Sequence, residues 1–232
     1  LSVGNIDRNP SIETLEIRQR DIWLQHRDQT VDEQRQRGFK PRPDVEAWPL
    51  DLPLDWAADP FRDKNWRFLL HAWRMVNPFL IAYFRSKDVS LLHEALVYIF
   101  DWHKFHFTEK RGCKYSWYDM SVGIRAMHLA LFMDKVSRKE LILSERENSI
   151  LLELVDAHAE KLQIESEIAN NNHGLFQVIG LNLLCMVAHD RHACVNGREF
   201  AARMFDKLMK GQFTSEGVHR ENSPDYHFFV LN

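Results

Sequence analysis

A helical spacing of apolar residues, persisting from residue 65 to about residue 210, constrains this chain more than any other feature. Apolar side chains recur three and four positions apart within the segments 65–84, 90–105, 120–136, 144–164, 172–189 and 197–210. Glycine and proline, which interrupt helices, number only 9 and 8 among 232 residues. No segment shows the alternation of a half-buried strand. The pattern predicts an all-α fold of antiparallel helical hairpins, with an α-solenoid and a closed or incomplete α/α toroid both compatible with it.

Local signals predict several helix boundaries. Ser144 and Glu147 have the spacing of a capping box, so a helix should begin after Ser144. Pro78 lies inside the 65–84 segment and should kink it. Gly211 should end the 197–210 helix.

The N-terminal part differs from the rest in composition. Residues 1–40 are polar and charged with a thin apolar stripe, and they predict a helical arm or connector. Most prolines lie in residues 38–64, which should run extended across a packed surface. We therefore divide the chain into an arm, 1–40, and a helical domain, 41–232. Because the sequence starts at Leu1 and stops within an apparent helix, we expect it to be a piece of a longer protein.

Composition excludes several classes of function. The net charge of −3 gives no indication of nucleic acid as a partner. No apolar run approaches the length of a membrane span. The three cysteines are odd in number and lack paired spacing, which argues against a disulfide scaffold and against a zinc site. We expect no metal and no cofactor.

The first candidate functional segment is Asn170–Gly174, at the start of the 172–189 helix. Asparagine is a favoured N-cap, but three asparagines and a histidine supply more polar groups than capping needs. The free amides and the positive end of a helix dipole favour an anion at this point. Asn172 and His173 are therefore candidates for binding a carboxylate.

A second candidate segment runs from Glu216 to His227. Ser223 followed by Pro224 predicts a helix start, which places Tyr226 and His227 in the first turn. A phenol titrates near about 10 in water, and the positive end of a helix dipole favours the phenolate. In an array of antiparallel hairpins this helix start and that at Asn172 open on the same rim, with Glu221 just before the second one.

These segments resemble the heparinase II/III-like polysaccharide lyases and the related toroid alginate lyases. Asn172-His173-Gly174 opening an apolar helix, and Glu221-x-Ser-Pro-x-Tyr-His about 50 residues later, carry the resemblance. Trp117-Tyr118-Asp119 with Arg125, and the segment 60–66, resemble further family segments. The resemblance covers roughly residues 45–232.

The resemblance implies an incomplete α/α toroid followed by a β-sheet domain of the same protein that is absent from this chain. It implies that Asn172 contacts a uronate carboxylate and that Tyr226 is the catalytic acid, which also serves as the base in several members of the family. The residue that matches His173 is functional in some members. An acidic polysaccharide would be the substrate, cleaved by β-elimination in the periplasm or outside the cell. We assign Trp117, Arg125, Glu221 and His227 to substrate binding.

Two other functions fit the same sequence. A toroid glycoside hydrolase would use carboxylates such as Asp119 and Glu221. A non-catalytic helical module would bind polysaccharide without turnover. Convergence of Asn172, His173 and Tyr226 in space would favour the lyase.

Overall fold

The described part of the chain, residues 29–212 of a computed structural model, is helical and contains no β-strand. Its α-helices are α2 (Val31–Arg37), α3 (Lys64–His71), α4 (Asn77–Ser86), α5 (Ser90–His103), α6 (Asp119–Ser137), α7 (Glu145–Leu162), α8 (Asn172–Val187) and α9 (Gly197–Gln212). Short turns of 3₁₀-helix lie at Arg74–Val76, Glu165–Glu167 and His192–Cys194, and one π-helical turn follows α5 at Lys104–Thr108. The predicted all-α fold is confirmed for these residues.

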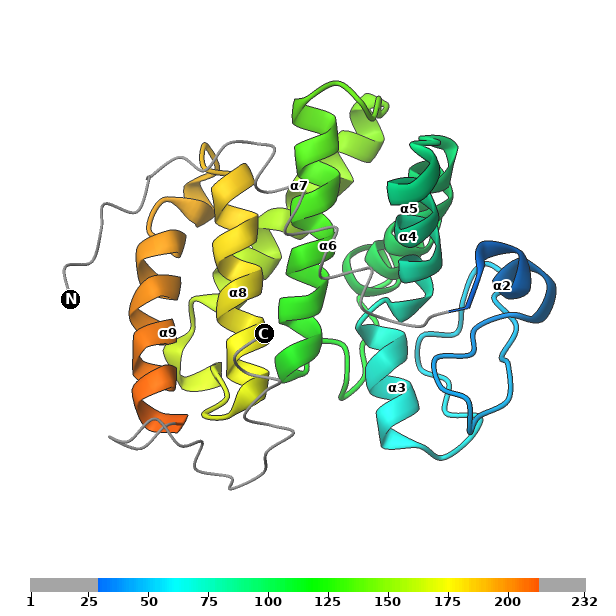
Figure 1. The fold of residues 1–232 in the computed structure, drawn as a ribbon, viewed down its shortest axis with the longest axis horizontal. Helices are drawn as coiled ribbons and strands as arrows, with labels where there is room; N and C mark the ends of the chain where they lie inside the picture. Colours follow the sequence, from blue (N-terminus) through cyan, green and yellow to red (C-terminus); the bar gives the residue numbers. More distant parts are fainter. Residues whose placement is uncertain (1–28, 213–232) are drawn as a thin grey trace.

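The helices from α6 onward alternate in direction, as Figure 1 shows. In that view α6 and α8 both begin at the lower end, α9 begins at the upper end, and α8 lies between α6 and α9. Helix α7 packs against both α6 and α8. The predicted antiparallel hairpins are thus present as α6–α7 and α8–α9. Closure of the array into a toroid stays a prediction.

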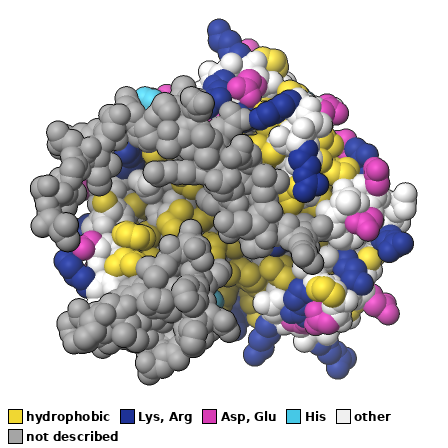
Figure 2. Space-filling model, in the orientation of Figure 1, with side chains coloured by type: hydrophobic (Ala, Val, Ile, Leu, Met, Phe, Trp, Pro, Cys, Tyr) yellow, Lys and Arg dark blue, Asp and Glu magenta, His cyan; other side chains and the backbone are white. Residues whose placement is uncertain are grey.

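Helix α8 is the central element of this half of the molecule, because neighbours cover most of its surface. Its buried residues are spread around the helix rather than confined to one stripe. Apolar residues on all sides are expected of a helix surrounded by protein. In Figure 2 charged side chains project around the periphery of the described part of this face, and apolar side chains lie toward its middle.

Glycines allow α6 and α8 to approach at backbone distance. A Cβ atom added to Gly123 of α6 would overlap the carbonyl oxygen of Phe176 in α8. A Cβ atom added to Gly180 of α8 would overlap the carbonyl oxygen of Gly123. The two helices, which run parallel, are therefore held in one register by a contact that no larger residue permits.

The segment predicted as one kinked helix, residues 65–84, is two helices. Helix α3 ends at His71, Trp73 takes a left-handed conformation with φ of 56°, and α4 begins at Asn77. A proline ring clashes with the carbonyl four residues earlier, so Pro78 is tolerated in the first turn of a new helix rather than inside a continuing one. The break lies one turn before the proline, and the side chain of Trp73 is fully buried there.

Residues 38–63 are irregular and contain several turns, whereas an extended segment was predicted for 38–64. The chain doubles back so that Phe39 and Trp48 form an antiparallel bridge, and a carboxylate anchors the later part of the segment. Asp101 of α5 accepts hydrogen bonds from the Leu54 amide and from Nε1 of Trp56, each at 2.9 Å. Trp56 is 1% exposed. The preceding helix α2 is tied to the array by Gln34, whose side-chain amide donates to the Met75 carbonyl at 2.8 Å. The division at residue 40 into arm and domain stays a prediction.

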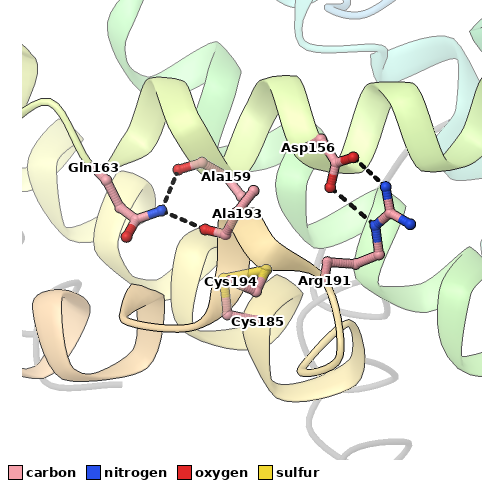
Figure 3. The surroundings of a disulfide bond; sticks show 7 residues. All are labelled: Asp156, Ala159, Gln163, Cys185, Arg191, Ala193 and Cys194. Atoms are coloured by element: carbon pink, nitrogen blue, oxygen red, sulfur yellow. Dashed lines mark hydrogen bonds and ion pairs between the residues drawn. A yellow bond between two sulfur atoms is a disulfide. The ribbon is translucent and has the colours of Figure 1, made fainter.

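A disulfide bond joins Cys185, near the end of α8, to Cys194 in the following turn (Figure 3). The chain reverses after α8 and brings the two Cα atoms within 4.8 Å across nine residues of sequence. Gln163, the residue that follows α7, donates to the carbonyls of Ala159 in α7 and of Ala193, which fastens the same turn to α7. The argument from cysteine spacing against disulfides was wrong for this pair, because the reversal that pairs them is a tertiary feature.

The other predicted helix boundaries can be compared directly. Ser144 and Glu147 form the predicted capping box at the start of α7. Helix α9 continues to Gln212, so Gly211 lies in its last turn rather than after it.

We expect Gly123→Ala to lower the free energy of unfolding by about 2–3 kcal/mol, because the added methyl group forces α6 and α8 apart. Thermal unfolding followed by circular dichroism measures the effect. Gly211→Ala is the matched control, since an added Cβ there meets only Asn170 Oδ1 at 3.6 Å and alanine favours the helix. Equal stability of the Gly123→Ala variant and the native protein would contradict the close contact.

Candidate functional site

Two helices begin side by side at one end of the array. Helix α6 begins at Asp119 and α8 at Asn172, and the glycine contact between them brings these first turns together. Each first turn carries amides without an intrahelical acceptor and the positive end of a helix dipole. We call this end, defined by Asp119, Asn171, Asn172 and His173, the asparagine–histidine rim.

The start of α8 is fixed by Asn171 and Gly174. Asn171 is the N-cap, and its side-chain oxygen accepts a hydrogen bond from the His173 amide at 2.9 Å. A Cβ atom on Gly174 would overlap the Ala169 carbonyl oxygen, so the chain can enter the helix this tightly only with glycine. Capping is therefore the task of Asn171. Among the described residues the side chain of Asn172 has no hydrogen-bond partner.

A buried glutamine holds the loop that leads into α8. Gln177, 3% exposed, accepts a hydrogen bond from the Ala169 amide at 2.9 Å and donates to the Glu167 carbonyl at 3.0 Å. These two bonds replace the regular backbone pairing that the loop lacks. The positions of Asn171 and Asn172 are thus set from both sides, by the helix and by the loop.

His173 forms an ion pair or hydrogen bond with Asp119 of the neighbouring helix. Its Nδ1 lies 3.0 Å from Asp119 Oδ2, and the two side chains are 35% and 23% exposed. An ionised carboxylate can only accept, so Nδ1 is the donor. The other carboxylate oxygen of Asp119 accepts from the Met120 amide. This leaves Nε2 of His173 as the ring nitrogen available to a ligand.

Asp119 is a functional candidate whose role as a partner of His173 was not recognised from the sequence. The two residues are 54 positions apart. An acidic residue at a helix start is common enough that its position gave no sign of a histidine partner. Only a pairing of α6 with α8 could have indicated it, and that pairing is not encoded in any local motif.

Arg125 lies in the core, two turns into α6, and not on the rim. Its Nε donates to His158 Nε2 at 2.8 Å, and one Nη donates to the His71 carbonyl at 2.6 Å. The guanidinium also lies 4.5 Å from the ring centre of Trp102 and 5.3 Å from that of Trp117. Its side chain is fully buried. All of these contacts are with residues of the core. The burial of Arg125 does not support the predicted contact with substrate, which stays a prediction.

The histidines around Arg125 are held neutral. Burial, followed by the charge of Arg125, lowers the pKa of His71 to about 3. The same two causes hold the pKa of His158 well below its usual range. Burial also lowers the pKa of Arg125, to about 9, so the guanidinium stays charged at neutral pH. A cation among neutral rings therefore occupies the middle of the core.

Trp117 connects this core to the rim. Its ring packs edge-on against Trp102 at 5.5 Å and lies 4.9 Å from His158, measured between ring centres. The side chain is half-buried and lies two residues before Asp119. Stacking of a sugar on Trp117 stays a prediction.

Three predicted site residues, Glu221, Tyr226 and His227, lie outside the described residues. The described chain ends at Gln212 on the same side as the rim. A Cβ atom on Gly174 would lie 3.1 Å from the Leu208 side chain, which places the last turns of α9 beside the start of α8. The predicted convergence of Tyr226 with Asn172 and His173 stays a prediction.

The described residues offer no group of three or more histidine, cysteine, aspartate or glutamate side chains placed to hold a metal ion. Among the helices of that region, none combines the length and the apolar character needed to cross a membrane.

The fold and rim define a helical domain with an amide and an imidazole at one end of parallel helices. A family model described as heparinase II/III N-terminus matches residues 10–232, and the chain therefore belongs to that family. The comparisons with curated proteins and with solved structures found no match.

We expect the stability of this protein to fall as the pH drops below about 6.5, partly because of His71. The unfolded chain binds a proton on this histidine near its ordinary pKa, whereas the folded chain does so only near about 3. The stabilisation is present above about pH 6.5 and is lost progressively toward pH 3, with a magnitude of roughly 5 kcal/mol.

His71→Gln tests this expectation, since an amide can still accept from Trp102 and donate to the Trp56 carbonyl. Urea unfolding at a series of pH values should show a weaker pH dependence for the variant. His192→Gln is the control because His192 is exposed. Identical pH dependence in the native protein and the His71 variant would show that this histidine does not contribute.

Proposed function

We propose that this chain is the helical domain of a polysaccharide lyase that cleaves uronate-containing glycans by β-elimination. The observation that carries the proposal is the rim, where the first turns of two helices lie side by side. The side-chain amide of Asn172, which has no partner within residues 29–212, and the Nε2 of His173 lie at this end. Membership of the heparinase II/III N-terminus family supports the same reading.

The chemistry of elimination requires this combination of groups. Removal of the C5 proton of a uronate places negative charge on the adjacent carboxylate as an enediolate. Hydrogen bonds from Asn172 and from a protonated His173 grow stronger as that charge develops, and therefore stabilise the transition state more than the bound substrate. The electron pair of the C5–H bond then forms the C4–C5 double bond as the C4–O4 bond breaks.

Tyr226 is our candidate for the proton transfers. As a phenolate it would take the C5 proton, and as a phenol it would give a proton to the departing O4. It follows Gln212 by 14 residues, a length of chain that can span up to roughly 45 Å. Since Gln212 lies on the side of the rim, this length permits Tyr226 to reach Asn172 and His173.

The environment of Asp119, one of the two carboxylates that a glycoside hydrolase would use, argues against the hydrolase alternative. A hydrolase needs Asp119 as a free acid, base or nucleophile. In the structure both oxygens of Asp119 are engaged, one by His173 and one by the Met120 amide. The arrangement suits a carboxylate that holds an imidazole.

We further propose that the protein works in the periplasm or outside the cell, on acidic polysaccharide, together with a β-sheet domain of the same protein. The Cys185–Cys194 disulfide supports this location, because such bonds persist in oxidising compartments. The positive ends of the two helix dipoles at the rim favour a negatively charged substrate.

The test is the ultraviolet absorbance of 4,5-unsaturated uronates released by the intact protein from heparin, heparan sulfate, alginate and other acidic glycans. We expect Asn172→Ala, His173→Ala and Tyr226→Phe each to lower kcat by about 10²- to 10⁴-fold with smaller changes in KM. Asn196→Ala, an exposed asparagine in the turn before α9, is the control and should retain full activity.

Two results would overturn the proposal. Products with a saturated non-reducing end and a new reducing end would show a hydrolase. Binding of the glycans without any turnover, over a wide range of pH, would show a non-catalytic module. Full activity of the Tyr226→Phe variant would remove that tyrosine from the mechanism.

A further inference from the structure

Asp119 has no assigned part in the elimination, yet it is the most constrained side chain of the rim. One of its oxygens accepts from the Met120 amide and the other from Nδ1 of His173 at 3.0 Å. Its side chain is 23% exposed, less than the 35% of His173. A carboxylate this engaged is better suited to orienting a neighbour than to reacting with substrate.

The contact between the two side chains is built into the fold on both sides. On the α8 side, Asn171 accepts from the backbone amide of His173 at 2.9 Å. On the α6 side, Asp119 is the first residue of a long helix that packs on α8 through Gly123 and Gly180. Because α6 and α8 are in contact through their backbones at these glycines, helix packing brings the carboxylate and the imidazole within hydrogen-bond distance.

We propose that Asp119 is a positioning residue that fixes the proton of His173 on Nδ1 and thereby presents Nε2 to the uronate. The proposal rests on the proposed lyase function for its kinetic consequence but not for its structural one. A carboxylate on one ring nitrogen decides which tautomer is present and which nitrogen faces the ligand.

When both nitrogens carry protons, Nδ1–H bonds to Asp119 and Nε2–H is free to donate to the substrate carboxylate. That bond is charge-assisted and strengthens as the enediolate forms. The proton stays on His173 throughout, so Asp119 acts through the imidazole and does not touch the substrate.

A purely structural role would also explain an aspartate at a helix start, because acidic residues stabilise the first turn through the helix dipole. Glu145 provides the matched case. It is the first residue of α7, it is exposed, and it lies outside the rim. Glu145→Gln removes the same kind of helix-terminal charge without touching His173.

The experiment uses the intact protein labelled with ¹⁵N, and it reads the two ring nitrogens of His173 by NMR at neutral pH. We expect a protonated Nδ1 in the native protein and in Asp119→Asn, whose amide oxygen can still accept. In Asp119→Ala we expect the Nε2-protonated tautomer to appear. Glu145→Gln should leave the spectrum unchanged, and His173→Gln identifies the signals.

The kinetic arm measures kcat and KM on the glycan that the native protein cleaves. Asp119→Asn should lower kcat by at least about 10- to 100-fold, the range seen when a metal-bound histidine loses its carboxylate partner, with little change in KM. Asp119→Ala should lower it at least as far, and Glu145→Gln should not lower it.

The outcomes separate the two proposals. If the native protein has no lyase activity but His173 shows the expected tautomers, the proposed lyase function is refuted and the positioning of His173 by Asp119 is supported. An active enzyme whose tautomer and kcat are unchanged in Asp119→Ala would refute the positioning role alone. Circular dichroism spectra matching those of the native protein verify that each variant is folded.

Discussion

The backbone contact between α6 and α8 is the constraint on which the rest of this structure depends. Gly123 and Gly180 leave no room for a side chain, so each helix lies against the other's carbonyl groups. The contact fixes the two helices in direction, in register and in distance. Their first turns therefore lie side by side at one end of the array, where the Asp119 side chain contacts that of His173. A looser packing through large side chains would allow the first turns to slide past one another.

The core next to this contact is organised around a cation. Arg125 is fully buried and has neutral partners, namely the rings of Trp102 and Trp117, an imidazole nitrogen of His158 and a backbone carbonyl. Burying a charge is costly unless hydrogen bonds and polarisable groups replace the lost water. Here these replacements come from four separate segments of the chain. The arginine therefore links α6 to α3, α5 and α7.

Much of the fold could be predicted from local patterns. The apolar spacing gave the helices from α5 to α9 to within a few residues, and the Ser144–Glu147 pair marked the start of α7. Local patterns failed where distant residues decide the outcome. The break at Trp73 depends on the burial of that ring as well as on Pro78, and the Cys185–Cys194 bond depends on a chain reversal after α8. Arg125 was assigned to substrate from the family resemblance, and that assignment stays a prediction although its side chain is buried in the core.

The sequence by itself determined that this chain is helical, where most helices start, and that Asn172 and His173 begin an apolar helix. These properties follow from interactions between residues a few positions apart, which a sequence displays directly. Only the tertiary structure decided that Asn171, and not Asn172, caps the helix, and that Asp119 contacts His173, a residue 54 positions away in the sequence. The physical reason is that helix packing brings together two residues that are distant in the sequence. The glycines that permit this packing form no local pattern from which the contact could be predicted.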